Sequence, residues 1–350
     1  MAIQIRRDPA ARWTSVNPVL ASMELGCESD TGKVKVGDGS STWTQLDYAA
    51  TTAPLAVPGV TQGSTSGYAS GGNAPSGGIN VIEKFSFSSD GNATDVGDLT
   101  VAKLATAGQS STASGYSSGG YVPTDPVGLS NVIDKFPFAT DANATDVGDL
   151  TGIKYHLAGQ SGSSSGYTSG GSSPTGAVNV IEKFPFASDA NATDVGDLTA
   201  VRYFLAGQNS ADNGYSSGGY PPYTNIIDKF PFSSDANATD VGNLTVARGY
   251  VTGQSSDVSG YTSGGYMPPT TNVIDKFSFS SDGNATDVGD LTVAKYGAAG
   301  QSSTVSGYSS GGGAPGASNV IEKFPFSSDA NATDVGDLTQ VKYYAAGQQV

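Results

Sequence analysis

The sequence contains almost no cysteine and almost no histidine. Cys27 is the only cysteine among 350 residues, so no disulfide framework exists and stability must come from packing or from assembly. His156 is the only histidine, which argues against a Ser–His–Asp arrangement and against a histidine-rich metal site. We therefore expect no enzymatic activity, no catalytic residue, no metal site and no cofactor.

Charge and long apolar runs are also scarce. Charged residues make up 14% of the chain and the formal net charge is −15, which argues against a nucleic-acid-binding protein. No apolar run approaches the roughly 18 residues of a membrane span, and no signal-peptide pattern is present, so we expect no membrane insertion. No long segment has the period of an amphipathic helix, whereas glycine, aromatic and β-branched residues are frequent, which indicates an all-β protein.

One phrase recurs through most of the chain. It reads NIIDKFPFSSDANATDVGNL at Asn225–Leu244, and near copies stand about 48 residues apart. A period of roughly 40–50 residues with several short strand signals is typical of a propeller. The other copies occupy Asn80–Leu99, Asn131–Leu150, Asn179–Leu198, Asn272–Leu291 and Asn319–Leu338.

Each repeat contains four strand signals, in the order AGQ, GYxSGG, NVIDKFPF and TDVGDL. Four such strands form a small antiparallel sheet that must pack against its neighbours around an axis. We therefore predict a six-bladed β-propeller over residues 60–350, preceded by a linker over residues 51–59. Ala346-Gly347-Gln348 is expected to supply the innermost strand of the first blade and so close the ring; the alternative is that Gly59–Gly63 fills this place.

The repeats resemble kelch-type propellers. A tyrosine precedes twin glycines, a basic residue precedes the next blade, and an aromatic residue follows a short Val/Ile strand, at Phe85, Phe136, Phe184, Phe230, Phe277 and Phe324. The usual tryptophan near the fourth strand is replaced by Asp-Val-Gly. The resemblance implies a divergent kelch-like fold.

Residues 1–50 do not share the repeat, and alternation at Ala2–Arg6 and Lys33–Val36 indicates short strands. The motifs at Ile3–Arg7, Trp13–Ala21 and Glu28–Gly39, followed by Trp43, resemble the N-terminal domain of bacteriophage tail-fibre and tropism-determinant proteins. This resemblance implies a small β-rich domain that trimerises and attaches to other tail or adaptor proteins of a virion assembled in the host cytoplasm. A generic small β unit is the alternative.

Charge in the propeller region follows the repeat. Its twelve bases stand at two fixed places per unit, and nearly all its acids are likewise at repeat positions, so we predict structural ion pairs and solvated rims. The segment at Asp90, Asn92 and Asp95 offers oxygen atoms that Ca²⁺ accepts, but a capped turn is the simpler interpretation.

The loops after the twin glycines and the segments before the innermost strands vary between units. In a kelch-like layout both emerge on one face, which is then nearly uncharged and rich in tyrosine, a composition suited to recognition of neutral sugars. The alternative is that the tyrosines in the segments before the innermost strands fill the central channel as core residues. We expect Tyr121, Tyr220, Tyr223 and Tyr266 to be exposed. The candidate ligand-binding residues are Tyr121, Tyr155, His156, Tyr203, Tyr220, Tyr223, Tyr250, Tyr266, Tyr296 and Tyr343.

These features predict a phage fibre or spike protein that recognises a host-surface glycan or protein without enzymatic action. One alternative is a structural or decoration protein of the virion. Another is a surface-polysaccharide depolymerase, which would need two carboxylates in different environments, whereas here the acids recur sixfold and none is distinct.

Overall fold

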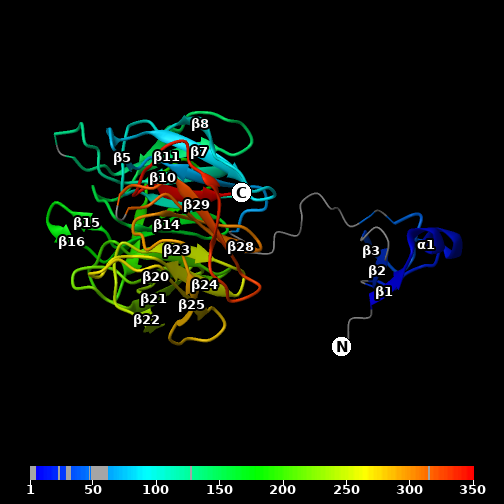
Figure 1. Cartoon of the computed structure of the whole chain (residues 1–350). Coiled ribbons are helices and arrows are strands. Elements are labelled where there is room, and N and C mark those ends of the chain that lie inside the picture. Colours follow the sequence, from blue (N-terminus) through cyan, green and yellow to red (C-terminus); the bar gives the residue numbers. More distant parts are fainter. Residues whose placement is uncertain are drawn as a thin grey trace. The chain divides into compact units, whose positions relative to one another are not determined.

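A computed structural model describes residues 5–22, 24–28, 33–46, 48, 62–126, 128–313 and 316–350 (Figure 1). The chain divides into two compact units, Met1–Val57 and Pro58–Val350. The predicted linker, residues 51–59, lies outside the described residues. No helix in the described part of the chain is long and apolar enough to cross a membrane.

The first unit is a three-stranded sheet with one short helix. Strand β1 (Ile5–Asp8) pairs in parallel with β2 (Leu25–Glu28), which pairs antiparallel with β3 (Val34–Val36). Helix α1 (Ala10–Val16) follows Pro9 and was not predicted, because seven residues are too few to show a helical period. Of the two predicted strands, the second agrees with β3, whereas the described part of the first extends beyond Arg6 to Asp8.

The core of this unit consists of Trp13, Leu20 and Trp43. The two indole rings stack with their centroids 4.2 Å apart, and Trp13 Nε1 donates a hydrogen bond to the carbonyl oxygen of Cys27 at 3.0 Å. Buried Lys35 donates to the carbonyl oxygens of Trp43 and Leu46 at 2.8 and 2.6 Å. The tryptophans that stand out in the sequence therefore form the centre of a very small core.

The second unit is a ring of six four-stranded antiparallel blades, as predicted. From inner to outer strand, blade 1 is β31 (Ala346–Gln349), β4 (Ser66–Ser70), β7 (Val81–Ser86) and β8 (Thr94–Asp98), and blade 2 is β9 (Ala107–Ser110), β10 (Ser114–Ser118), β11 (Val132–Pro137) and β12 (Thr145–Asp149). Blade 3 is β13 (Ala158–Ser161), β14 (Ser165–Ser169), β17 (Val180–Pro185) and β18 (Thr193–Asp197), and blade 4 is β19 (Ala206–Asn209), β20 (Asn213–Ser217), β21 (Ile226–Pro231) and β22 (Thr239–Asn243). Blade 5 is β23 (Thr252–Ser255), β24 (Ser259–Ser263), β25 (Val273–Ser278) and β26 (Thr286–Asp290), and blade 6 is β27 (Ala299–Ser302), β28 (Ser306–Ser310), β29 (Val320–Pro325) and β30 (Thr333–Asp337).

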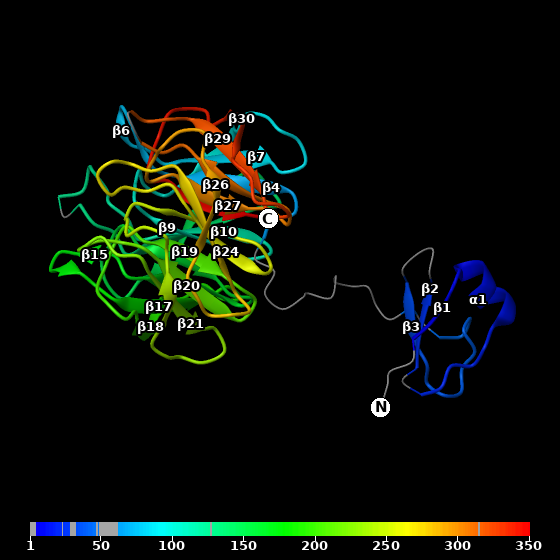
Figure 2. The same ribbon diagram turned by 60° about the horizontal axis from the view of Figure 1, so that its bottom comes forward.

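Two of the variable loops form small two-stranded hairpins. One is β5 (Asn73–Ala74) with β6 (Gly77–Gly78) in blade 1, and the other is β15 (Ser172–Ser173) with β16 (Gly176–Ala177) in blade 3. Both project from the side of the propeller away from the C-terminus (Figures 1 and 2).

The C-terminal strand closes the ring, as predicted. β31 pairs antiparallel with β4, placing Gly347 opposite Ala69. A Cβ atom added to Gly347 would stand 2.0 Å from the carbonyl oxygen of Gly300, and one added to Gly108 would stand 2.2 Å from that of Gly347. The innermost strands thus approach one another so closely that only glycine fits. The alternative was that Gly59–Gly63 supplies this innermost strand. For Gly63 it is wrong, because Gly63 forms a β-bridge with Ser303 instead. Residues 59–61 lie outside the described part of the chain.

Three repeated interactions join each blade to the next. First, the glutamine after the inner glycine is buried and its side-chain nitrogen donates to the tyrosine carbonyl oxygen of the next blade, as from Gln109 to Tyr167 and from Gln348 to Tyr116. Second, that tyrosine's ring packs on two phenylalanines of the following blade; Tyr68, for example, contacts Phe136 and Phe138. These contacts bury apolar surface between sheets that could not stand alone.

The third interaction uses charge and confirms the predicted ion pairs. An outer, partly exposed set contains Lys84–Asp141, Lys135–Asp189, Lys183–Asp235, Lys229–Asp282, Lys276–Asp329 and Lys323–Asp90. An inner, buried set contains Lys103–Asp134, Lys154–Glu182, Arg202–Asp228, Arg248–Asp275, Lys295–Glu322 and Lys342–Glu83. A threonine hydroxyl of the preceding blade also donates to each inner carboxylate, as from Thr245 to Asp275 at 2.7 Å. Every basic residue in the described propeller therefore links two blades.

Candidate functional site on the loop face

The variable loops and the segments before the innermost strands lie on the same face, as predicted. The two are joined by single β-bridges at each junction, for example Tyr155 to Ser172 and Tyr203 to Tyr220. We call this side the loop face. The chain enters the propeller on the opposite face, where Gly63 bridges to Ser303 and the C-terminal carbonyl oxygen of Val350 accepts from Thr65 and Ser66.

A closed ring of backbone hydrogen bonds surrounds the axis at the loop face. One residue per blade donates its N–H to the carbonyl oxygen of the equivalent residue in the preceding blade; the six residues are Ala105, His156, Phe204, Tyr250, Gly297 and Tyr344. All have positive φ, between 56° at His156 and 62° at Gly297. Non-glycine residues avoid this conformation, so the ring is fixed by its six-fold bonding rather than by local preference.

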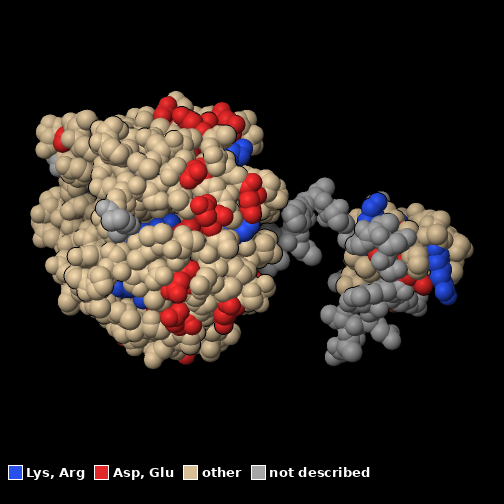
Figure 3. Space-filling view, in the orientation of Figure 1, with Lys and Arg blue, Asp and Glu red and all other residues tan. Residues whose placement is uncertain are grey.

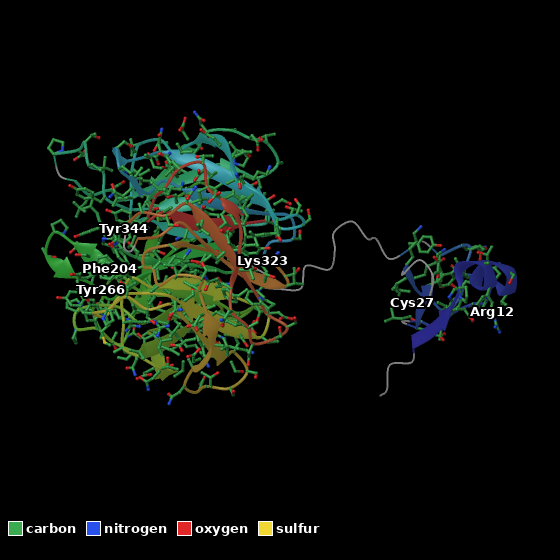
Figure 4. All side chains as sticks on the ribbon, viewed as in Figure 1. Arg12, Cys27, Phe204, Tyr266, Lys323 and Tyr344 are labelled. Carbon is green, nitrogen blue, oxygen red and sulfur yellow. The ribbon has the colours of Figure 1, made fainter. Side chains whose placement is uncertain are left out.

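Four of these residues carry rings that meet over the axis, and we call His156, Phe204, Tyr250 and Tyr344 the axial cap. The ring centroids of Phe204 and Tyr250 are 3.4 Å apart, those of His156 and Phe204 3.9 Å, and those of His156 and Tyr344 4.9 Å. Figure 4 shows Phe204 and Tyr344 close together, with Lys323 on the opposite side of the propeller. A cavity of ≈ 100 Å³ lies beneath the cap.

The environment of the cap keeps its ionisable groups neutral. Burial lowers the pKa of His156 to about 3. Burial and neighbouring tyrosines raise the pKa of Tyr250 to about 12 and also raise that of Tyr344. The axis is therefore closed by uncharged rings at neutral pH.

The remaining candidate tyrosines surround the cap, and we call them the tyrosine crescent: Tyr121, Tyr155, Tyr203, Tyr220, Tyr223, Tyr266, Tyr296 and Tyr343. Ring contacts run from Tyr121 to Tyr155 at 6.2 Å, pass to Tyr203 through His156 at 4.6 and 6.4 Å, and continue to Tyr220 at 5.7 Å. From there they reach Tyr223 at 4.9 Å, Tyr266 at 6.1 Å, Tyr296 at 6.1 Å and Tyr343 at 6.3 Å. The eight tyrosines, with His156 of the axial cap between Tyr155 and Tyr203, thus form one continuous row of rings.

The crescent offers polar groups as well as rings. Tyr343 Oη accepts a hydrogen bond from Asn73 Nδ2 at 2.6 Å. Within the described residues, the hydroxyls of the other crescent tyrosines make no hydrogen bond with the protein. These groups can both donate and accept, so the surface can match a ligand rich in neutral polar groups.

The loop face carries almost no charge. Of the described residues in the variable loops, only Asp125 is charged. Figure 3 shows acidic side chains gathered toward the side that bears β8 and the C-terminus in Figure 1, whereas the side with the β15–β16 hairpin is almost free of them. A ligand on the loop face therefore meets aromatic and hydroxyl groups rather than an electrostatic field.

The side chains of the acidic turns are already engaged. Asp90 pairs with Lys323, the Asn92 side-chain oxygen accepts from the backbone N–H of Asp337 at 3.0 Å, and Asp95 accepts from that of Gly97 at 3.2 Å. The equivalent groups of the other blades repeat these bonds. The geometry is that of capped, blade-joining turns, the simpler of the two interpretations.

All ten candidate residues thus lie on one face and are joined by ring contacts, but in two different settings. His156 and Tyr250 belong to the axial cap, so for these two residues the alternative interpretation, packing at the central channel, describes their position. Tyr121 is 39% exposed, whereas Tyr220, Tyr223 and Tyr266 are half-buried rather than fully exposed. Phe204 and Tyr344 were not candidates, although in Tyr203-Phe204 and Tyr343-Tyr344 they occupy the same place as His156 in Tyr155-His156. Asn73 was missed because nothing in its sequence context indicates that it binds a tyrosine hydroxyl.

Comparison with known proteins finds a similarity within the first unit. Residues 3–41 match the family model of the major tropism determinant N-terminal domain. This part of the first unit is therefore similar to a tropism-determinant N-terminal domain. This domain indicates a phage tropism or tail-fibre-like protein and a component of the virion tail. The match ends before the propeller, and no curated protein matches the chain.

Proposed function

We propose that the propeller recognises the surface of the host through the loop face, without enzymatic action, and that its ligand is a glycan. The observation that carries this proposal is the row of tyrosines, interrupted only by His156 between Tyr155 and Tyr203, on a face almost without charge. The contacts that hold the blades together repeat from blade to blade, whereas the loops that surround the crescent differ in sequence and length. Variation on a fixed scaffold is characteristic of a recognition surface.

The chemistry of the crescent favours a sugar. Tyrosine rings are rigid amphipathic surfaces that stack on the apolar faces of other groups, and their hydroxyls exchange hydrogen bonds with polar ligands. Positive side chains, which a phosphate-rich ligand would require, do not occur in the described loops of this face. A neutral glycan meets both conditions, and a protein of the host surface is the other partner that the crescent would accept.

The first unit completes the proposal. A tropism-determinant domain supports attachment to the virion, and we extend this to a homotrimer that contacts other tail or adaptor proteins through residues 1–50 after assembly in the host cytoplasm. Nucleic acid and membrane lipid are not partners in this proposal.

The test is adsorption to host cells by the full-length chain. Replacing Tyr220, Tyr223 and Tyr266 together by alanine removes the densest part of the crescent, and each change of hot-spot type lowers affinity by about 5- to 30-fold. Val258→Ala, at a side chain 62% exposed on the opposite face, is the control and should adsorb normally. Both variants should keep the melting temperature of the wild type. Unchanged adsorption of the triple variant would refute the proposal.

Two further measurements, adsorption without the propeller and release of sugar, separate the two alternatives. A decoration protein would adsorb equally with and without the propeller. A depolymerase would release sugar from the host envelope, which the proposal does not expect. Neither alternative is favoured by a specific contact on the loop face.

A further inference from the structure

The crescent is a row rather than a pocket. With His156 counted as the link between Tyr155 and Tyr203, consecutive rings are never more than 6.4 Å apart along a path that has a tyrosine at each of the six blade junctions. The two cavities on the axis, of ≈ 120 and ≈ 100 Å³, are lined by the innermost strands and the axial cap, and no crescent tyrosine contributes to either. Both are also below the roughly 300 Å³ at which ligand pockets begin.

From this shape we propose that the ligand is the interior of an extended, uncharged polysaccharide chain that lies along the crescent across several blades, rather than a terminal sugar held in a pocket. This inference rests on the proposed function and adds the form of the ligand to it. A chain that follows the row places successive sugars over successive rings, so that many weak contacts replace one deep site.

The hydroxyls support a chain that is hydroxyl-rich along its whole length. Tyr121, at one end of the crescent, and Tyr203 and Tyr220, near its middle, each have an Oη without a partner in the described protein. A ligand that covered only one of these sites would leave the other hydroxyls to water. The row of free hydroxyls thus matches a ligand that repeats its polar groups at intervals.

The crescent also has a middle and two ends. Tyr203, Tyr220, Tyr223 and Tyr266 belong to the junctions around blade 4 and follow one another at 4.9–6.1 Å. Tyr121 and Tyr343 stand at the two ends, and no ring contact in the described residues joins them directly. A short fragment is expected to bind in the middle, whereas only a long one reaches both ends.

The test uses surface polysaccharide released from cells to which the full-length chain binds, separated into oligosaccharide fractions of increasing length. Affinity should rise with length and then level off. Tyr220→Ala should weaken all fractions, whereas Tyr121→Ala and Tyr343→Ala should weaken only the long fractions, by about 5- to 30-fold. Periodate treatment of the cells should remove binding, and protease treatment should leave it.

The outcomes are distinguishable. Equal affinity for all lengths, equal effects of the end and middle variants, or loss of binding after protease treatment would overturn the inference while leaving host recognition by the loop face intact. Normal cell binding by the triple variant at Tyr220, Tyr223 and Tyr266 would instead refute the proposed function itself. Melting temperatures equal to that of the wild type show that each variant is folded.

Discussion

Replacement of Gly347 by alanine tests whether the C-terminal strand is a full member of the ring. The new Cβ would stand 2.0 Å from the carbonyl oxygen of Gly300, and no rotamer change relieves a clash with backbone. A Cβ added to Gly159 would likewise stand 2.2 Å from the carbonyl oxygen of Gly108, in a blade whose four strands all come from one continuous segment of the chain. The two substitutions should therefore destabilise the propeller to a similar degree.

The size of the effect follows from the cost of inserting one methyl group into a packed interior, which is about 1–3 kcal/mol. For a unit of this size each kcal/mol lowers the melting temperature by roughly 2–4 °C, so a loss of about 2–12 °C is expected. Gly91→Ala is the matched control, because a Cβ there meets nothing within 4 Å and other blades carry alanine at this position. It should melt at or slightly above the wild-type temperature.

Calorimetry on the full-length chain measures all three variants. Normal melting of Gly347→Ala together with a destabilised Gly159→Ala would show that the C-terminal strand does not pack in the ring. Normal melting of both would show that the innermost strands are not in contact at all. Either result would refute closure as described.

Three further predictions concern stability. Arg248→Met should cost about 3–5 kcal/mol because it leaves the buried carboxylate of Asp275 without its positively charged partner. Lys276→Met, which breaks an outer pair, should cost less than about 1 kcal/mol in chemical denaturation. Because the pKa of His156 is lowered in the folded chain, the unfolded chain binds a proton below pH 6.5 that the folded chain does not. The free energy of unfolding of the wild type should therefore fall as the pH drops from about 6.5 toward 3, by at most about 1.4 kcal/mol per pH unit. His156→Phe should remove this contribution, as measured by melting curves at about pH 7 and about pH 4. A chelator should leave the melting temperature unchanged because protein groups already occupy the side chains of the acidic turns, and a fall of several degrees would contradict this.

The scaffold could be predicted from the sequence because its determinants are local and repeated. Six copies of one strand pattern define six blades, and the final AGQ motif has no blade of its own, so it must complete the first. The placement of bases at two fixed positions likewise predicts ion pairs, because a charge that recurs with the scaffold belongs to the scaffold. The six repeats within this one chain thus show which positions recur with the scaffold, as an alignment of related sequences would otherwise do.

The division of the site into cap and crescent could not be predicted. It depends on a left-handed backbone at Ala105, His156, Phe204, Tyr250 and Tyr344, which no local preference of these residues favours. The one available signal was Gly297 at the same position of another unit, since glycine is the residue that adopts this conformation without strain. The helix at Ala10–Val16 was missed for the opposite reason, because it is too short to form a pattern.

The separation between scaffold and loops explains how the loop face can vary. The described blade-to-blade contacts come from the glutamine, the tyrosine, the asparagine and the charged pairs of the strands and their flanks, and from the backbone ring around the axis. The variable loops supply Tyr121, Tyr220, Tyr223 and Tyr266 of the crescent. At each junction the bridge between a loop and the segment beside it is made by backbone atoms, so it accepts Leu104 with Tyr121, Tyr203 with Tyr220, or Tyr343 with Asn73 equally well. A change of side chain at these positions therefore alters the surface of the loop face and keeps these backbone bonds, although at Asn73 and Tyr343 it also removes the side-chain hydrogen bond between them.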